Sequence, residues 1–179
     1  MPIAHIETQR LRLRSFQRND WQAVYEYTAD PAVMGYIPEG PFTPAQAQAF
    51  VADNMGAHAR AVAVLLKTAN ILIGHIVFHP WEASQTYEIG WVFKRASHGQ
   101  GYATDAAVAV LPYGFAALPL HRIIATCQPQ NVASWRVMEK LGMRREGHFR
   151  KCLRRPENQW WDEYFYALLA EEWFTAHGT

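Results

Sequence analysis

This sequence contains few cysteines, no long apolar run and almost no net charge. Its two cysteines, Cys127 and Cys152, form no CxxC or zinc-ligand spacing, as is typical of reduced thiols in the cytoplasm. No apolar run approaches the roughly 20 residues that span a bilayer. The opening MPIAHIETQR lacks the apolar core of a signal peptide. We therefore expect a cytoplasmic protein that has no membrane partner.

Several classes of ligand also lack their usual residues. The net charge is only +1, which argues against a protein built to bind nucleic acid. No GxxxxGK[ST] P-loop occurs, and GQGYAT lacks the third glycine of the dinucleotide motif GxGxxG. His75 and His79 lie in a strand-like segment, ILIGHIVFHPW, which would hold them too far apart to share a metal. We expect neither a metal nor a nucleic acid as ligand.

What the sequence does contain is an ordinary globular composition. Of its 179 residues, 50% are hydrophobic and 18% are charged. A chain of this length can bury a core of its own, and we find no internal repeat, linker or low-complexity segment in it. Residues 1–179 are therefore predicted to form a single domain.

Hydrophobic periodicity predicts strands and helices in the order β α α β β β α β α β β. The strand 121–129 is short and fully apolar, so we expect it to be central and parallel to a neighbour. Hairpins around one crossover helix predict an α+β fold, with a mixed, mostly antiparallel sheet of six to seven strands and helices on both faces. The predicted strands are 10–16, 61–67, 71–81, 86–93, 121–129, 143–153 and 159–169, and the predicted helices are 18–30, 43–59, 102–118 and 131–142.

Local signals mark the ends of the predicted helices. Thr43 and Gln46 form a capping box at the start of one helix. Asn131 can cap the start of another, and Gly142 stands where a C-terminal capping glycine belongs. Pro112 is expected to kink the helix 102–118 late in its course.

A glycine-rich turn, RASHGQGYATDA, follows the strand TYEIGWVF and precedes a helix. Gly99 and Gly101 have two possible roles there. They can simply permit positive backbone dihedrals in a tight turn. Alternatively, the turn can let successive N–H groups at the helix start approach a phosphate, with the helix dipole favouring the negative charge.

Six segments together resemble a known family. HGQGYA, with IETQRLRLRSF, DPAVMGYIP, YEIGWVF, NVASWRVMEKLGMRREG and LLAEEW in the same order, resembles the GNAT superfamily of acyl-CoA-dependent N-acetyltransferases. The RimJ/RimL-like branch, which includes ribosomal-protein N-terminal acetyltransferases, is the most similar part of it. The resemblance covers nearly the whole chain. It implies a splayed sheet of the acyl-CoA N-acyltransferase fold and acetyl-CoA as co-substrate.

The resemblance also implies a cofactor site. The family's loop [Q/R]xxGx[G/A] is matched from His98 to Ala103, although His98 stands where Gln or Arg is usual. Pyrophosphate would lie on the N–H groups of residues 98–104, and the pantetheine arm would follow the preceding strand. Arg136 would reach the phosphates or would pair with Glu139 or another neighbour. The implied cofactor-binding residues are Trp91, Val92, Phe93, His98, Gly99, Gln100, Gly101, Tyr102, Ala103, Thr104, Asn131 and Arg136.

Glu88 is the candidate general base. An α-amine with a pKa near 8, or a lysine amine near 10.4, is mostly protonated at neutral pH, so the reaction needs a proton acceptor. Glu88 lies in an apolar strand on the same face as Gly90 and Val92, and it matches the family's usual base position. The alternative is a structural ion pair between Glu88 and a nearby arginine.

Ser134 is the second catalytic candidate. It follows Asn131 by one helical turn, and in the RimJ/RimL-like branch this serine hydrogen-bonds the thioester sulfur. Many superfamily members have a tyrosine acid further along the helix, where this sequence has Met138. The alternative role for Ser134 is that of an ordinary residue at a helix start.

Three classes of function remain open. The favoured one is direct transfer of an acetyl group from acetyl-CoA to a primary amine, with the α-amine of a protein or peptide N-terminus preferred to a polyamine, antibiotic or other small amine. A catalytically silent acyl-CoA-binding protein is the second. The third is a nucleic-acid-binding protein that uses the basic run RREGHFRKCLRRPE, residues 144–157. A monomer and a homodimer are both compatible with the sequence.

Overall fold

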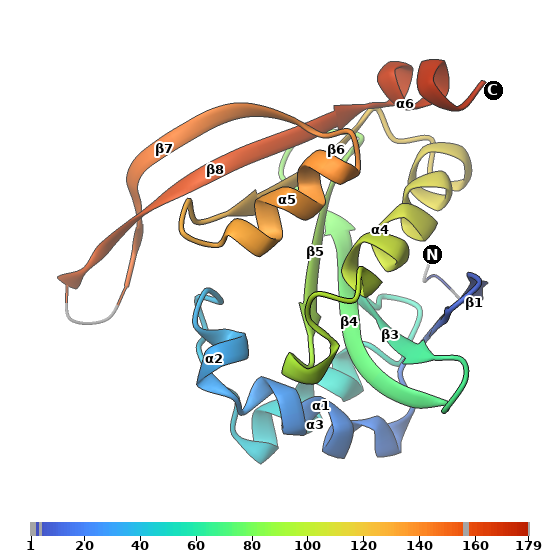
Figure 1. Ribbon diagram of the computed structural model, residues 1–179, viewed down its shortest axis with the longest axis vertical. Helices are drawn as coiled ribbons and strands as arrows, with labels where there is room; N and C mark the ends of the chain where they lie inside the picture. The colour runs from blue at the N-terminus through green and yellow to red at the C-terminus, as the bar shows by residue number, and fades with distance from the viewer. Residues whose placement is uncertain (1–2, 4, 156–157, 179) are drawn as a thin grey trace.

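The structure, a computed structural model, describes residue 3 and residues 5–155 and 158–178. These residues form one eight-stranded sheet in the order β1-β2-β3-β4-β5-β6-β8-β7 (Figure 1). The strands are β1 (His5–Glu7), β2 (Leu11–Arg14), β3 (Ala61–Leu66), β4 (Ile71–Pro80), β5 (Thr86–Phe93), β6 (Arg122–Cys127), β7 (Arg144–Arg154) and β8 (Trp160–Leu169). The helices are α1 (Trp21–Thr28), α2 (Pro31–Met34), α3 (Pro44–Asp53), α4 (Tyr102–Pro112), α5 (Val132–Lys140) and α6 (Ala170–His177), with short helical turns η1 (Arg18–Asp20), η2 (Arg95–Ser97) and η3 (Tyr113–Ala117).

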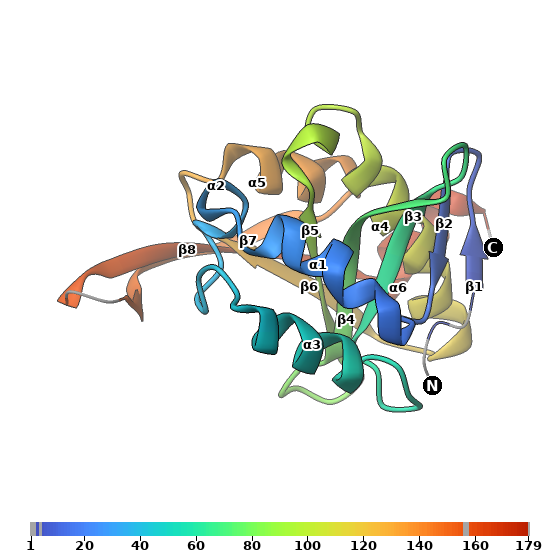
Figure 2. The same cartoon turned by 90° about the horizontal axis from the view of Figure 1, so that it is seen from below.

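Helices cover both faces of the sheet (Figure 2). Strand β3 shows why, because its buried side chains alternate between two cores. Ala63 and Leu65 pack into a core with residues of α1 and α3, whereas Val62 and Val64 pack into a core with residues of α4. A strand that is apolar on both faces needs cover on both, and this pattern fixes the layered α+β arrangement.

The sheet splits between β5 and β6. These two strands are parallel and pair only from Thr86–Glu88 to Arg122–Ile124. Beyond that point β5 stays paired with β4 as far as Phe93, and β6 stays paired with β8 as far as Cys127. The two halves of the sheet therefore separate after Glu88, which confirms the central, parallel position predicted for the strand 121–129.

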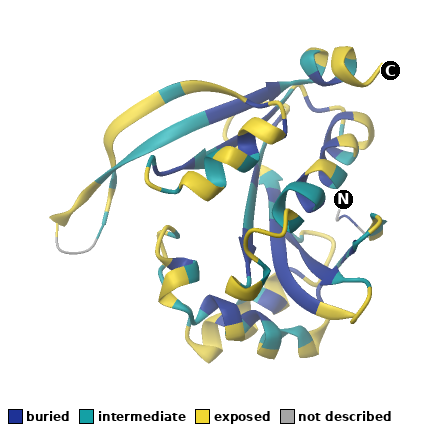
Figure 3. Cartoon of the chain, in the orientation of Figure 1, coloured by how far each residue is buried: buried dark blue, intermediate teal, exposed yellow. Residues whose placement is uncertain are grey.

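Strands β7 and β8 form a long arm that extends from the body of the molecule (Figure 1). Its outer half is exposed or half-buried (Figure 3), and β7 is an edge strand. The predicted turn 154–159 between the two strands includes residues 156 and 157, which lie outside the described residues. Among the helices that the structure describes, none is long and apolar enough to span a bilayer.

The predicted fold class is confirmed, with local differences. The structure adds β1, so eight strands are described in place of six or seven, and it adds the short helix α2 and the terminal helix α6. The helix predicted for 43–59 ends at Asp53, and the helix predicted for 18–30 begins as the turn η1 and ends at Thr28. α-Helical geometry gives way to a π turn after Pro112. The differences concern very short elements and helix ends, where periodicity carries little signal.

Helix capping agrees with the sequence at two places. The Thr43 hydroxyl accepts the N–H of Gln46, and the Gln46 side chain accepts the N–H of Thr43, so the predicted capping box is present. At α5, Asn131 Oδ1 accepts the Ser134 N–H at 3.3 Å. Gly142 has φ +78° just beyond the same helix, the left-handed conformation that ends helices.

Candidate active site

The turn between β5 and α4 has the backbone that its glycines predict. Gly99 has φ +73° and Gly101 has φ +78°, a conformation that costs most other residues energy. Gly101 immediately precedes Tyr102, the first residue of α4. A helix start leaves its first N–H groups without partners inside the helix. The backbone donors of this turn are therefore available to a negatively charged ligand.

Arg10, the residue immediately before β2, holds this turn against the sheet. Its Nε donates to Asp105 Oδ2 at 2.8 Å, and its Nη1 donates to the carbonyl oxygen of Gln100 at 3.0 Å. The guanidinium also lies 4.8 Å from the centre of the Tyr102 ring. The sequence gives no local signal for this role of Arg10, because its partners lie some ninety residues further along the chain.

His98 and Gln100 each make a contact that holds the turn to the rest of the protein. The Nε2 of His98 lies 2.8 Å from the carbonyl oxygen of Phe93, so this nitrogen donates its proton to β5 and holds the turn against the strand end. The carbonyl of Gln100 serves Arg10, and Gln100 does not line the adjoining cavity. The contribution of this turn to binding is therefore mainly its backbone.

A cavity of about 410 Å³, here called the loop cavity, lies along the turn and the end of β5. Arg136 and Lys140 from α5 line it, and no Asp or Glu does so among the described residues. This charge suits an anionic ligand such as a polyphosphate. All predicted cofactor residues except Gln100 line it: Trp91, Val92, Phe93, His98, Gly99, Gly101, Tyr102, Ala103, Thr104, Asn131 and Arg136.

Arg136 lies beside the ring of its neighbour Trp135, at the edge of the loop cavity. Its guanidinium carbon lies 5.7 Å from the centre of the Trp135 ring. Among the described residues it forms no ion pair with Glu139. Its charge is therefore available at the edge of the loop cavity.

A larger cavity of about 650 Å³, here called the carboxylate cavity, lies where the sheet splits. Glu88, Glu163, Asp53 and Glu39 line it, together with residues of α3, β4, β6 and α5. It shares six lining residues with the loop cavity: Tyr36, Ile37, Trp91, Val92, Asn131 and Ser134. The two cavities thus meet beside the second half of β5.

Glu88 lines the carboxylate cavity from β5. Burial raises the pKa of Glu88, and the nearby His79 and a hydrogen bond from Thr126 oppose this change only in part. The Thr126 hydroxyl donates to Glu88 Oε1 at 3.4 Å. No arginine pairs with Glu88 among the described residues, so the alternative of a structural ion pair lacks its partner. A half-buried carboxyl with a raised pKa is suited to proton transfer near neutral pH.

Ser134 lies at the junction of the two cavities. Its hydroxyl hydrogen-bonds the buried Cys127 thiol, and burial raises the pKa of that thiol to about 12. Cys127 is therefore a neutral thiol at physiological pH and a poor nucleophile. Met138, at the position where many relatives have tyrosine, is buried and lines the carboxylate cavity. This leaves Ser134 as the hydroxyl donor of α5 at the junction.

The arm and the segment after α2 meet beside the carboxylate cavity. Arg155 Nη1 donates to the carbonyl oxygen of Ile37 at 3.1 Å, and its guanidinium lies 4.3 Å from the centre of the Trp161 ring. Trp161 in turn packs edge-to-face against Tyr36, with ring centres 6.2 Å apart. These contacts, which the sequence did not predict, join residues distant in the chain into one wall.

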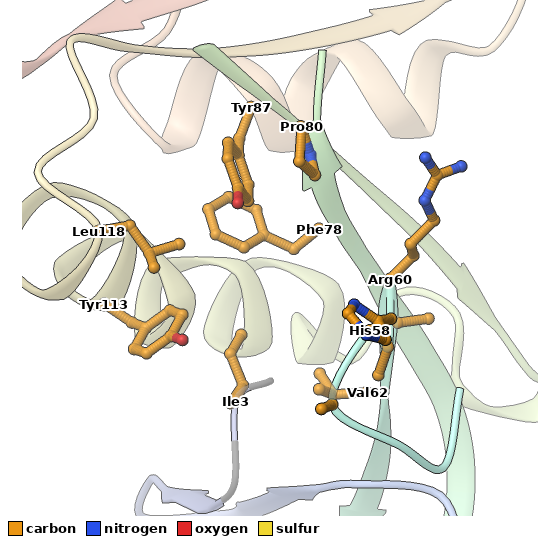
Figure 4. Close-up of a pocket in the computed structure, with 12 residues that line it drawn as sticks. Ile3, His58, Arg60, Val62, Phe78, Pro80, Tyr87, Tyr113 and Leu118 are labelled. Atoms are coloured by element: carbon orange, nitrogen blue, oxygen red, sulfur yellow. The ribbon is translucent and has the colours of Figure 1, made fainter. Parts of the chain in front are cut away.

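A further cavity of about 300 Å³ lies away from all of these residues (Figure 4). Figure 4 shows Phe78 and Tyr87 on one side of the space and Tyr113 and Leu118 across from them. Among the described residues it is lined by no carboxylate and by none of the predicted site residues. Nor do the residues that the structure describes include a group of three or more His, Cys, Asp or Glu side chains placed to bind a metal.

Comparisons with known proteins agree with this geometry. The family model described as an acetyltransferase (GNAT) domain matches residues 10–144. An uncharacterized N-acetyltransferase of Bacillus subtilis (strain 168), YnaD, is 57% identical over 169 residues, which cover 94% of this chain and 99% of the relative.

Solved structures give the same result. The crystal structure of a GNAT-family acetyltransferase from Bacillus anthracis superposes with a TM-score of 0.90 at 56% identity, covering 94% of this chain and 99% of that one. A ribosomal-protein-S5-alanine acetyltransferase from Vibrio fischeri shares the fold, with a TM-score of 0.79 at 21% identity and coverage of 95% and 98%. Because the family model spans most of the chain and a relative matches nearly all of it, this chain belongs to the GNAT family and is an N-acetyltransferase.

Proposed function

We propose that this protein transfers an acetyl group directly from acetyl-CoA to a primary amine at the junction of the loop cavity and the carboxylate cavity. GNAT acetyltransferases use acetyl-CoA, which supplies the acyl thioester. The observation that carries the proposal is the junction itself. The loop cavity is basic and has backbone donors at the turn, and the carboxylate cavity is acidic and contains the half-buried Glu88. The two meet between β5 and Ser134 of α5.

The loop cavity fits coenzyme A by its chemistry. The N–H groups of residues 98–104 would hold the pyrophosphate, helped by the dipole of α4 and by the charge of Arg136. The backbone of β5 from Trp91 to Phe93 would hydrogen-bond the pantetheine arm as an added strand does, because this part of β5 has no partner in β6. Asn131 would contact the same arm.

Glu88 would act as the general base. The acceptor arrives as an ammonium, and Glu88 takes its proton directly or through a water. The new N–C bond then forms as the C–S bond of the thioester breaks. The sulfur leaves as a thiolate with a hydrogen bond from Ser134, and the nitrogen gives its second proton to that thiolate or to water. A backbone N–H of β5 would stabilise the negative charge on the carbonyl oxygen.

For the acceptor we propose the α-amine of a peptide or protein N-terminus. An α-amine loses its proton about 2 pKa units more readily than a lysine amine, which suits a single carboxylate as base. The RimJ/RimL-like sequence segments support the same class. A small amine is the second candidate, and the acidic lining of the carboxylate cavity favours it, because such a lining attracts any compact cation.

The test is incubation with acetyl-CoA, detection of free thiol, and mass spectrometry of a panel of peptides and small amines. We expect thiol release that depends on an amine, and faster acetylation of peptides with free N-termini than of N-terminally blocked peptides that contain lysine. Thiol release without an acetylated amine would indicate hydrolysis only. Cofactor binding without thiol release would leave the silent acyl-CoA-binding protein as the correct class.

A further inference from the structure

The two connected cavities carry opposite charge. The carboxylate cavity is lined by Glu39, Asp53, Glu88 and Glu163, and among the described residues no Lys or Arg lines it. The loop cavity is lined by Arg136 and Lys140. Proton transfer to the base needs only one carboxylate, so the additional negative charge requires a different explanation.

Glu163 is the acidic residue most closely joined to Glu88. The two lie on β8 and β5, on either side of Thr126 in β6. The Thr126 hydroxyl is 3.4 Å from Glu88 Oε1 and also hydrogen-bonds the Glu163 side chain. One hydroxyl has one proton to donate, so it can satisfy only one of the two carboxylates at a time.

The charged form of Glu163 is poorly compensated by the protein. Burial raises the pKa of Glu163, the charge of Glu88 raises it further, and the bond from Thr126 only partly opposes this. Neither carboxyl forms an ion pair with Lys or Arg among the described residues. Of the groups that line the same cavity from other elements, His79 on β4 lies near Glu88, and Asp53 on α3 adds a further carboxylate.

A buried histidine in the same cavity adds no positive charge. His75 is 4% exposed, and burial lowers its pKa to about 3, so it is neutral at physiological pH. Its Nδ1 hydrogen-bonds the Tyr27 hydroxyl at 2.7 Å, whereas its Nε2 has no partner among the described residues. His75 therefore lines the cavity as a neutral ring that offsets none of the carboxylate charge.

We propose that Glu163 is a specificity-determining residue, which binds a second positive charge carried by the acceptor while Glu88 takes the proton of the reacting amine. This inference rests on the proposed function. It names the acceptor class more narrowly as an amine with a second cationic group close to the reacting nitrogen, such as a diamine or a peptide N-terminus followed by a basic side chain. A negative charge at the same place is disfavoured by the same carboxylates.

The test uses three acceptors with the reacting amine at one end of the same carbon chain: diaminobutane, butylamine and aminobutyrate. They differ only in the group at the other end, which is positive, neutral or negative. For the unaltered enzyme we expect kcat/KM to fall in that order, with about tenfold or more between the diamine and the monoamine, the usual value of one hydrogen bond to a charged group.

The variant that isolates the residue is Glu163→Gln. We expect the preference for diaminobutane over butylamine to disappear, mainly through a higher KM for the diamine. Glu163→Asp keeps the charge and should keep part of the preference. Glu171→Gln is the matched control, because it removes one exposed carboxylate on α6 outside both cavities. A melting shift with acetyl-CoA in every variant verifies that each is folded.

The outcomes separate this inference from the proposed function. Acetylation of all three acceptors at equal rates, or an unchanged diamine preference in Glu163→Gln, would refute the role of Glu163 and leave acetyl transfer intact. An equal loss for diamine and monoamine in that variant would also refute it, because Glu163 would then serve the reacting nitrogen. No acetylation of any amine or peptide would instead refute the proposed function itself.

Discussion

Half of the residues that line the loop cavity come from one stretch of chain, residues 91–104, whereas the carboxylate cavity is lined by side chains from β4, β5, β6, β8 and α3, among others. The first offers backbone N–H groups and two basic side chains of α5. The second offers carboxylates brought together from segments that are distant in sequence. A shared cofactor can be recognised by backbone geometry that many sequences adopt, whereas an individual acceptor must be recognised by side chains. Under the proposed function, this difference assigns cofactor binding to the loop cavity and acceptor specificity to the carboxylate cavity.

The largest expected effect separates the two cavities by function. Glu88→Gln should lower kcat by about 10²–10⁴ at neutral pH, the usual contribution of a general base, and should leave acetyl-CoA binding unchanged. Because burial raises the pKa of Glu88, the unaltered enzyme should lose activity on acidification at a higher pH than an ordinary glutamate would give. The measurement is a pH–rate profile of both proteins.

The deficit of Glu88→Gln should shrink as the pH rises, because the acceptor amine then loses its proton unaided. Glu171→Gln, which changes the same functional group on the surface, should retain full activity. Equal rates for Glu88→Gln and the unaltered enzyme at neutral pH would return Glu88 to a structural role.

The next effect concerns the loop cavity alone. Acetyl-CoA at 100 times its dissociation constant should stabilise the fold by about 2.7 kcal/mol, and Gly101→Val should abolish that melting shift. Valine is strained at φ +78°, and its Cβ would lie 3.4 Å from Arg10 Nη2, which holds the turn. The measurement is thermal unfolding with and without acetyl-CoA.

Gly178→Val is the matched control for backbone strain. Gly178 also has a positive φ, +69°, but ends α6 away from the cavity. This variant should have a lower melting temperature and still respond to acetyl-CoA. A normal cofactor response in Gly101→Val would show that the turn does not approach the ligand.

A smaller effect tests how the turn is held. Arg10→Gln removes the ion pair to Asp105 and the bond to the Gln100 carbonyl, and it should weaken acetyl-CoA binding by roughly tenfold, the value of a hydrogen bond to a charged group. Asp105→Asn should have a similar effect. If both act by orienting the turn, the double variant should bind no more weakly than either single variant. Additive losses would contradict this coupling.

The smallest effect is expected at the junction. Ser134→Ala should lower kcat by about twofold to tenfold, the net value of a neutral hydrogen bond, because a thiolate leaves without much assistance. KM for acetyl-CoA should change little. Steady-state kinetics measure both constants, and a loss as large as that of Glu88→Gln would mean that Ser134 supplies a proton.

The sequence predicted the fold class, the central parallel strand and the GNAT family correctly, because each depends on periodicity or on motifs within short segments. It missed β1, α2 and α6, since short or terminal elements leave little periodic signal. The predicted assignments of Glu88, Ser134 and the cofactor residues stay predictions, although the structure gathers nearly all of them at two adjoining cavities. Gln100 is the exception, because its carbonyl serves Arg10.

By itself, the sequence determined whatever is encoded locally: two glycines with positive φ before a helix, an apolar strand containing one carboxylate, and a helix capped by Asn131. Only the tertiary structure decided that Arg10 holds the turn and that Thr126 links Glu88 to Glu163. The physical reason is that pairing between strands sets these neighbours. β5, β6 and β8 pair because each buries apolar surface against the others. The polar side chains that this pairing brings together follow no local sequence pattern from which their contacts could be predicted.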